Sequence, residues 1–148
     1  MRKSIPIILA VLCLFGFGCE APKQSAKARP AKGGLDEPPL ISLVQLIANP
    51  QDYHGKEVIV MGYLNLMLEG KIPFPFEGNA IYLHEDDWKH AVAKNGLALE
   101  ITSDFAKKQS WVDGKYVILR GRFNANNKGK GGHWSGTIEN VSNISYRR

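Results

Sequence analysis

A repeated stretch constrains the fold of this chain more than any other feature. Residues 55–64 read Gly-Lys-Glu-Val-Ile-Val-Met-Gly-Tyr-Leu, and residues 114–123 read Gly-Lys-Tyr-Val-Ile-Leu-Arg-Gly-Arg-Phe. Each copy begins at a turn and continues as a strand with one glycine at the same place. An interior glycine in a strand often marks a bulge or a bend. Two such strands predict a small sheet that curves until it closes on itself.

Apolar alternation and turn residues predict five strands and three short helical segments in all. We expect the first helix, capped by Ser42 and ended by Pro50, to cover the outer face of the first strand. The expected strands are residues 56–68, 79–84, 97–101, 115–123 and 133–144, and the expected helices are residues 42–49, 85–96 and 103–111.

The predicted fold class is therefore all-β with short helices. The order of elements resembles the OB-fold, a five-stranded Greek-key barrel in which the first and fourth strands are neighbours. Residues 40–148 also resemble a group of small, largely uncharacterised bacterial envelope proteins. Those proteins open with Ser-Leu-x-Gln-Leu-Ile-x-Asn-Pro and continue with Tyr-x-Gly-Lys-x-Val, as residues 42–50 and 53–58 do here. This resemblance implies a fold and no established activity.

The N-terminus predicts export. Arg2 and Lys3 precede an apolar run that is too short to span a bilayer, so residues 1–18 read as a signal peptide. The small residues before Cys19 resemble a bacterial lipoprotein signal, in which the cysteine is acylated and becomes the first residue. Gly16 departs from that pattern, which usually has leucine there, and ordinary secretion or an uncleaved anchor are the alternatives. With only Cys19 left in the mature chain, no disulfide can form within it.

Residues 19–39 follow as a segment rich in proline, alanine and lysine, which predicts a flexible tether. Glu20 stands where an aspartate often signals retention at the inner membrane, so the expected address is the outer membrane, facing the periplasm. Residues 40–148 form the expected folded domain. They carry 13 basic and 11 acidic residues, and this near-neutral balance makes a nucleic-acid partner unlikely.

The candidate ligand-binding residues lie beside the repeated strands. A polar loop carries Lys128, Lys130 and Trp134, which in an OB-fold would border the ligand face; the alternative is a soluble glycine-rich hairpin loop. Arg120 and Arg122 share one side of the fourth strand and could extend that surface. In the loop after the first strand, Phe74 and Phe76 either bind a partner or cover the core.

A cluster from His84 to His90, with Glu85, Asp86 and Asp87 between, is conceivable as a metal site. Its spacing is not diagnostic, and the acids suit a helix start, so no metal site or cofactor is assigned. No catalytic motif is recognisable, and we expect no enzyme. The sequence favours a membrane-tethered binding module of the bacterial envelope that engages a protein or saccharide. The alternatives are an oligonucleotide-binding domain and a periplasmic metal-binding protein.

Overall fold

The computed structural model describes residues 37–72 and 76–146, all within one compact unit, Gly34–Arg148. The predictions on the signal peptide, Cys19, nearly all of the tether, and Phe74 lie outside these residues. Within the described part of the chain, no helix combines the length and the apolar character needed to cross a membrane.

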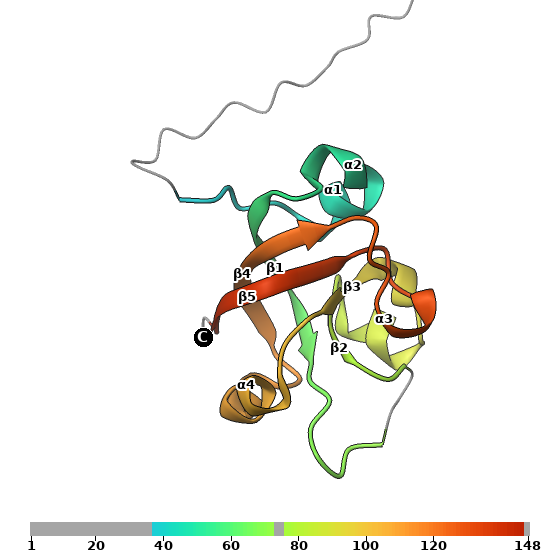
Figure 1. Ribbon diagram of the computed structural model, residues 1–148. Helices are drawn as coiled ribbons and strands as arrows, with labels where there is room; N and C mark the ends of the chain where they lie inside the picture. Colours follow the sequence, from blue (N-terminus) through green and yellow to red (C-terminus); the bar gives the residue numbers. More distant parts are fainter. Residues whose placement is uncertain (1–36, 73–75, 147–148) are drawn as a thin grey trace, which may run out of the picture. The chain divides into compact units, whose positions relative to one another are not determined.

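The described chain forms a closed barrel of five strands in the order β1-β2-β3-β5-β4 (Figure 1). The neighbouring strands are antiparallel except for β3 and β5, which are parallel. β1 and β4 pair over seven residues, from Glu57 opposite Arg122 to Tyr63 opposite Tyr116, so the predicted pairing of the two repeats is confirmed. The strands are β1 (Glu57–Asn65), β2 (Asn79–Tyr82), β3 (Gly96–Leu99), β4 (Tyr116–Asn124) and β5 (Thr137–Ser145).

Short helices fill the connections. The α-helices are α1 (Leu43–Ala48), α2 (Pro50–Tyr53), α3 (Glu85–Lys89) and α4 (Ser103–Lys108), and the 3₁₀ turns are η1 (Ala93–Asn95), η2 (Ser110–Val112) and η3 (Lys130–Gly132). The predicted helix over residues 85–96 is wrong in length, because the chain turns left-handed at Ala91, where φ is 59°. The N–H groups of Ala91 and Val92 donate back to the carbonyls of Trp88 and Asp87, which closes the helix as a Schellman motif.

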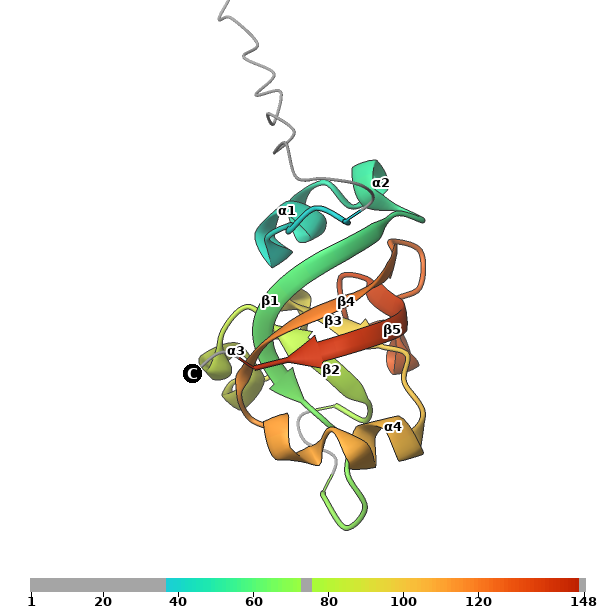
Figure 2. The same ribbon diagram turned by 90° about the vertical axis from the view of Figure 1, so that its left-hand side faces the viewer.

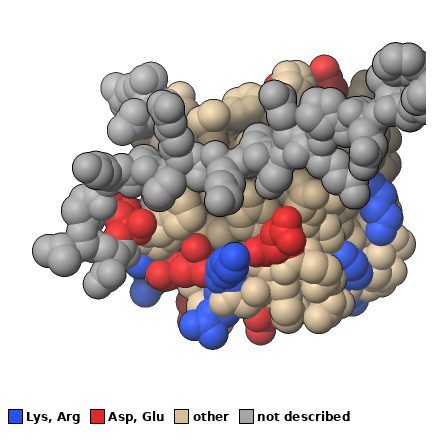
Figure 3. All heavy atoms as spheres, turned by 90° about the horizontal axis from the view of Figure 1, so that it is seen from above, with Lys and Arg blue, Asp and Glu red and all other residues tan. Residues whose placement is uncertain are grey.

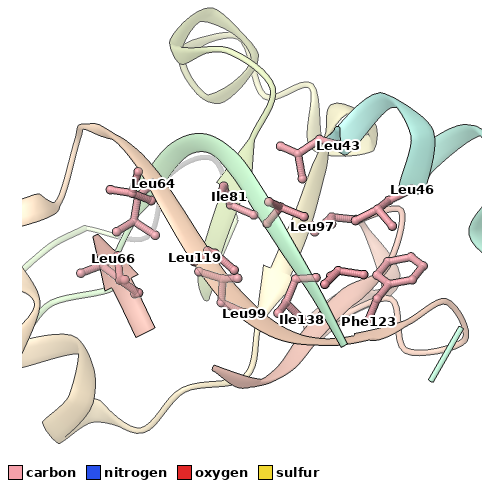
Figure 4. Packing of buried hydrophobic residues seen from close by; sticks show 14 of the residues in the cluster. Leu43, Leu46, Leu64, Leu66, Ile81, Leu97, Leu99, Leu119, Phe123 and Ile138 are labelled. Carbon is pink, nitrogen blue, oxygen red and sulfur yellow. The ribbon is translucent and has the colours of Figure 1, made fainter. Parts of the chain in front are cut away.

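The inward face of β1 begins the core. Val58, Val60 and Leu64 are fully buried there, as the alternation predicts. Leu43 and Leu46 of α1 join the same cluster, so α1 covers an end of the barrel interior (Figure 4). The prediction that this helix covers the outer face of β1 is therefore wrong.

Residues 39–41 lie along β1 instead. Leu40 forms a parallel bridge with Ile59, the N–H of Ile41 donates to the Ile59 carbonyl at 2.8 Å, and the N–H of Ile59 donates to the Pro39 carbonyl at 3.1 Å. This short segment fills the part of the β1 edge that lies before the pairing with β2 begins at Tyr63. The outward side chains of β1 are left largely uncovered by α1.

The two repeat glycines allow close approaches. A Cβ on Gly62 would lie 2.5 Å from the Tyr82 carbonyl oxygen, and one on Gly121 would lie 2.5 Å from Cγ2 of Ile138. The predicted bulge occurs at Gly121, where the pairing of β4 with β5 shifts register. At Gly62 the register with β4 is regular, and β1 curves over its length (Figure 2).

Candidate binding surfaces

Trp134 lies inside the molecule, at 1% exposure. It belongs to a second apolar cluster that includes Tyr82 and Ala98. Gly129 lies directly against this cluster. A Cβ on Gly129 would lie 2.6 Å from the Ala98 Cβ and 2.7 Å from the indole ring of Trp134. Trp134 is thus a core residue, and its ring faces are not free to stack on a ligand.

Phe76 covers this cluster. Its ring stacks on His133 at 4.5 Å and meets Trp134 edge-on at 5.7 Å between ring centroids. The sequence left open whether the phenylalanines of the loop after β1 bind a partner or cover the core. Phe76 covers the core.

The predicted cationic residues are engaged within the chain. Lys128 Nζ donates to the Ser135 carbonyl at 2.6 Å, and burial together with the nearby Lys94 lowers the pKa of Lys128. Lys130 forms an ion pair with Glu77 at 2.5 Å. The lysines of this loop therefore contact other parts of the protein. This agrees with the alternative interpretation, in which the segment is a soluble glycine-rich hairpin loop.

On β4 the two arginines differ. The guanidinium of Arg120 bonds to both carboxylate oxygens of Glu57, at 3.1 and 2.8 Å, and this bond lowers the pKa of Glu57. Arg122 is exposed. Basic and acidic side chains are interspersed on the visible face in Figure 3, so the two signs offset one another there.

A pocket of about 310 Å³ lies between β3 and the loop that joins β4 to β5. It brings together two of the predicted residues, Lys130 and Trp134, and adds the carboxylates of Glu77 and Glu100. Much of its polar lining is already bonded. Asn127 accepts from the Gly129 N–H at 3.0 Å and donates to a carboxylate at 3.2 Å. Its polar groups are therefore largely committed to holding the loop.

The predicted His84 to His90 cluster is a helix cap. Nδ1 of His84 accepts from the Asp86 N–H at 3.2 Å, and the Asp87 carboxylate accepts from the His84 N–H at 3.0 Å. These reciprocal bonds satisfy N–H groups that the first turn of a helix leaves without partners. Across residues 37–72 and 76–146, no three His, Cys, Asp or Glu side chains are arranged to hold a metal ion.

A different surface stands out on the outer side of β1 and β4, and we call it the Met61 face. Met61 pairs with Ile118 and Ile59 with Arg120 across the two strands, so their side chains share the outward side. Figure 2 faces this side of the barrel. Leu40 is 66% exposed, Met61 60% and Tyr116 41%. The apolar members of the Met61 face are Leu40, Ile59, Met61, Tyr116 and Ile118.

Part of the Met61 face is hollowed. A depression of about 390 Å³ is lined by the apolar side chains of Leu40, Ile59 and Ile118 together with the polar residues Glu37, Arg120, Asn143 and Ser145. Tyr116 extends the surface toward α3, because its hydroxyl accepts from the Glu85 N–H at 3.2 Å. A depression that combines apolar and polar side chains beside exposed apolar residues has the general form of a binding site for another molecule.

Sequence reasoning missed the Met61 face although the signal was present. Residues on the outward side of β1 are apolar, a pattern that equally predicts a covering helix. No protein-family model, curated protein or solved structure matches the chain. Its function is therefore inferred from its own residues.

Proposed function

We propose that this protein is a membrane-tethered module of the bacterial cell envelope that binds a protein partner through the Met61 face. The observation that carries this proposal is the row of exposed apolar side chains on β1, β4 and residues 39–41. Protein interfaces are enriched in tyrosine, methionine and arginine, which meet here as Tyr116, Met61 and Arg120. The ion pair with Glu57 already restricts the Arg120 side chain. Less side-chain entropy is therefore lost when a partner binds against it.

A saccharide is the less favoured partner. Sugar-sized sites combine apolar walls with a few polar groups that converge on the ligand. In the pocket beside β3 the Trp134 ring is buried, and Asn127 and Lys130 are bonded to the protein itself. Oligonucleotide binding is disfavoured in the same way, because Lys130 and Arg120 are each paired with a carboxylate.

The finer fold assignment is an OB-fold-like barrel. The parallel pairing of β3 with β5 and the position of α4 between β3 and β4 support it. The tether and the lipid on Cys19 rest on the sequence, through the short apolar run and the small residues that precede this cysteine. Glu20, which stands where an aspartate often signals retention at the inner membrane, makes the outer membrane, on its periplasmic side, the proposed address.

The test is cross-linking in intact cells. A photoreactive amino acid replaces Leu40, and the partner is trapped in the full-length protein. We expect one discrete adduct, and Met61→Glu should remove it because a carboxylate in the centre of an apolar interface must be desolvated. Val44→Glu is the matched control, since Val44 is 57% exposed on α1 and is not a member of the Met61 face.

An adduct that persists in Met61→Glu, or that Val44→Glu removes equally, contradicts the proposed surface. Cys19→Ser tests the anchor separately, and it should release the protein from the membrane fraction. Retention on single-stranded DNA that falls with salt would favour the oligonucleotide-binding alternative instead.

A further inference from the structure

Two lysines meet at one short segment of the loop that precedes β5. Lys94, in η1, donates from Nζ to the Trp134 carbonyl at 3.4 Å, and Lys128 donates from Nζ to the Ser135 carbonyl at 2.6 Å. The Ser135 hydroxyl also donates to the Lys94 carbonyl at 2.6 Å. The two ammonium groups therefore bind consecutive carbonyls of the same segment. We call Lys94 and Lys128 the lysine pair.

The lysine pair has no counter-charge in the part of the chain that the structure describes. Six ion pairs form there, and none of them includes Lys94 or Lys128. Burial and, after it, the nearby Lys94 lower the pKa of Lys128. The carbonyls accept one hydrogen bond from each lysine but do not cancel a full positive charge. The two ammonium groups therefore repel each other without compensation from the protein.

Lys128 differs in this respect from the other half-buried cations. Lys71 and Arg120 are each paired with a carboxylate, and Lys115 lies against two aromatic rings. Among the half-buried lysines and arginines of residues 37–72 and 76–146, Lys128 alone has neither kind of partner. Removing a charge from water is costly unless an opposite charge compensates it. The surroundings of Lys128 thus favour an anion that the protein itself does not supply.

The lysine pair keeps hydrogen-bond donors for such an anion. An ammonium group has three N–H donors, and each of these two lysines uses one of them on a carbonyl. Lys94 is exposed and Lys128 is half-buried, so the pair can be reached from solvent. A phosphate monoester offers three acceptor oxygens and a charge of about −1.5 to −2 near pH 7. Its charge therefore matches that of two lysines.

A hollow beside Lys94 gives room for a larger molecule. Its volume is about 440 Å³, and its other lining residues are Phe76, residues 91–93, Gly132 and His133. The His133 ring stacks on that of Phe76 at 4.5 Å between centroids, so aromatic packing fixes one wall. A small apolar group attached to a phosphate could lie in this hollow while the phosphate contacts Lys94.

We propose that the lysine pair binds the phosphate group of a small organic phosphate. This site shares no residue with the Met61 face, so it does not depend on the proposed protein partner. A nucleic acid is less suited to the site, because binding along a phosphate backbone relies on several cations in a row. The adjacent Lys130 is already neutralised by Glu77.

An NMR titration tests the site with defined ligands. The full chain carrying Cys19→Ser receives phenyl phosphate or inorganic phosphate at constant ionic strength, and the backbone amide signals of Trp134 and Ser135 are followed. We expect these signals to shift, and we expect phenyl phosphate to bind at least about three-fold more tightly because its ring leaves water. Lys94→Gln and Lys128→Gln should each raise the dissociation constant about ten-fold, since each removes a charged hydrogen-bond donor.

A second measurement separates binding from a purely structural role of Lys128. Bound phosphate should raise the pKa of Lys128, because a nearby anion stabilises the charged ammonium group. The pH dependence of the Lys128 ε-methylene NMR signal, with and without phenyl phosphate, reports this change. A lysine that only fastens the loop would show the same pKa in both conditions, which would contradict the proposal.

Lys130→Gln is the matched control. It removes the same charge from the same loop, but Lys130 is paired with Glu77, so the dissociation constant should change less than two-fold. Equal effects of the three lysine variants, or unmoved Trp134 and Ser135 signals, overturn the proposal. Lys94→Gln keeps this test valid if Lys128→Gln unfolds the loop, because Lys94 is exposed.

Two further outcomes concern the nature of the ligand. Equal affinity for the two phosphates overturns the part assigned to the hollow. A single-stranded oligonucleotide that binds more tightly than phenyl phosphate, and that Lys130→Gln weakens as much as Lys94→Gln does, overturns the proposal in favour of nucleic acid.

Discussion

Gly62 is enclosed on three sides. A Cβ at this position would lie 2.5 Å from the Tyr82 carbonyl oxygen, 2.7 Å from Cδ1 of Leu43 and 2.8 Å from Cγ1 of Ile81. The nearest of these atoms is backbone in β2, which cannot move without breaking the pairing of β1 with β2. The glycine of the first repeat therefore sets how closely β2 and α1 approach β1.

We expect Gly62→Ala to lower the free energy of unfolding by about 2 to 3 kcal/mol, since overpacking a closed core forces strands and side chains apart. Urea denaturation measures this loss. Gly70→Ala is the control, because a Cβ there has nothing within 4 Å and meets only the strain of a φ of 80°. Its cost should be about 1 kcal/mol. Equal losses in the two variants would show that backbone conformation, and not the close approach, explains Gly62.

Side-chain partners explain why the ligand-binding residues were harder to predict than the strands. Lys128, Lys130 and Arg120 look available in the sequence, but each meets a partner that only the folded chain supplies. The partner of Arg120 is Glu57, which stands 63 positions earlier. Exposure cannot be judged from residue type when the neutralising group is that distant. The burial of Trp134 likewise depends on residues that are distant in the sequence, such as Tyr82 and Ala98.

At the scale of elements, Asp113 fixes the turn before β4 to the end of β1. Its Oδ1 accepts from the Leu66 N–H at 2.7 Å, and both of its carboxylate oxygens accept from Lys71. Lys71 also donates to the Asn65 side chain at 2.8 Å and to the Leu66 carbonyl at 2.9 Å. A partly buried network therefore joins the ends of both repeats.

We expect Asp113→Asn to lower the free energy of unfolding by about 1 to 2 kcal/mol, because it weakens charge-assisted hydrogen bonds that water only partly screens. The Leu66 amide should also exchange its hydrogen faster, which hydrogen-exchange NMR would detect. Glu69→Gln is the comparison, since its ion pair with Lys107 is highly exposed and such pairs contribute about 0.5 kcal/mol or less. Similar losses in both variants would argue against a special role for Asp113.

Most of the helices and strands could be predicted from the sequence. The two long strands follow from the repeat, and β2 and β3 lie within about two residues of their predicted bounds. Alternating apolar residues carry this information because they depend on neighbours along the chain. The end of α3 could not be predicted from the sequence. The helix ends at a left-handed Ala91, whereas glycine is the usual residue in this position. The place of α1 was also misjudged, since sequence does not say which side of a strand a helix meets.

For the molecule as a whole, the exposed apolar side chains are spread over several parts of the domain. Leu40, Met61 and Tyr116 belong to the Met61 face, which follows the outer side of β1 and β4. Val44, Ile72, Val92, Trp111 and Tyr146 are also exposed and are not members of it. The Met61 face is therefore the place where two paired strands and residues 39–41 bring such side chains together.

Buried tyrosines make the stability of the whole barrel sensitive to alkaline pH. Burial raises the pKa of Tyr82 above its ordinary value, and the neighbouring indole of Trp134 opposes this only in part. Burial, with the carboxylates of Glu85 and Asp113, likewise raises the pKa of Tyr63. In the unfolded chain both hydroxyls have the ordinary tyrosine pKa of about 10. The folded state holds these protons to higher pH.

Stability must therefore fall as the pH rises. A group whose pKa is raised by folding contributes fully below the unfolded pKa, and this contribution is lost as the pH rises through the folded pKa. We expect the free energy of unfolding, measured in urea from pH 8 to pH 11, to decline above about pH 10. Tyr82→Phe should make the decline shallower, because phenylalanine has no proton to lose. Tyr53→Phe is the control, and an equal change in slope there would show that buried Tyr82 has no special part in the alkaline loss.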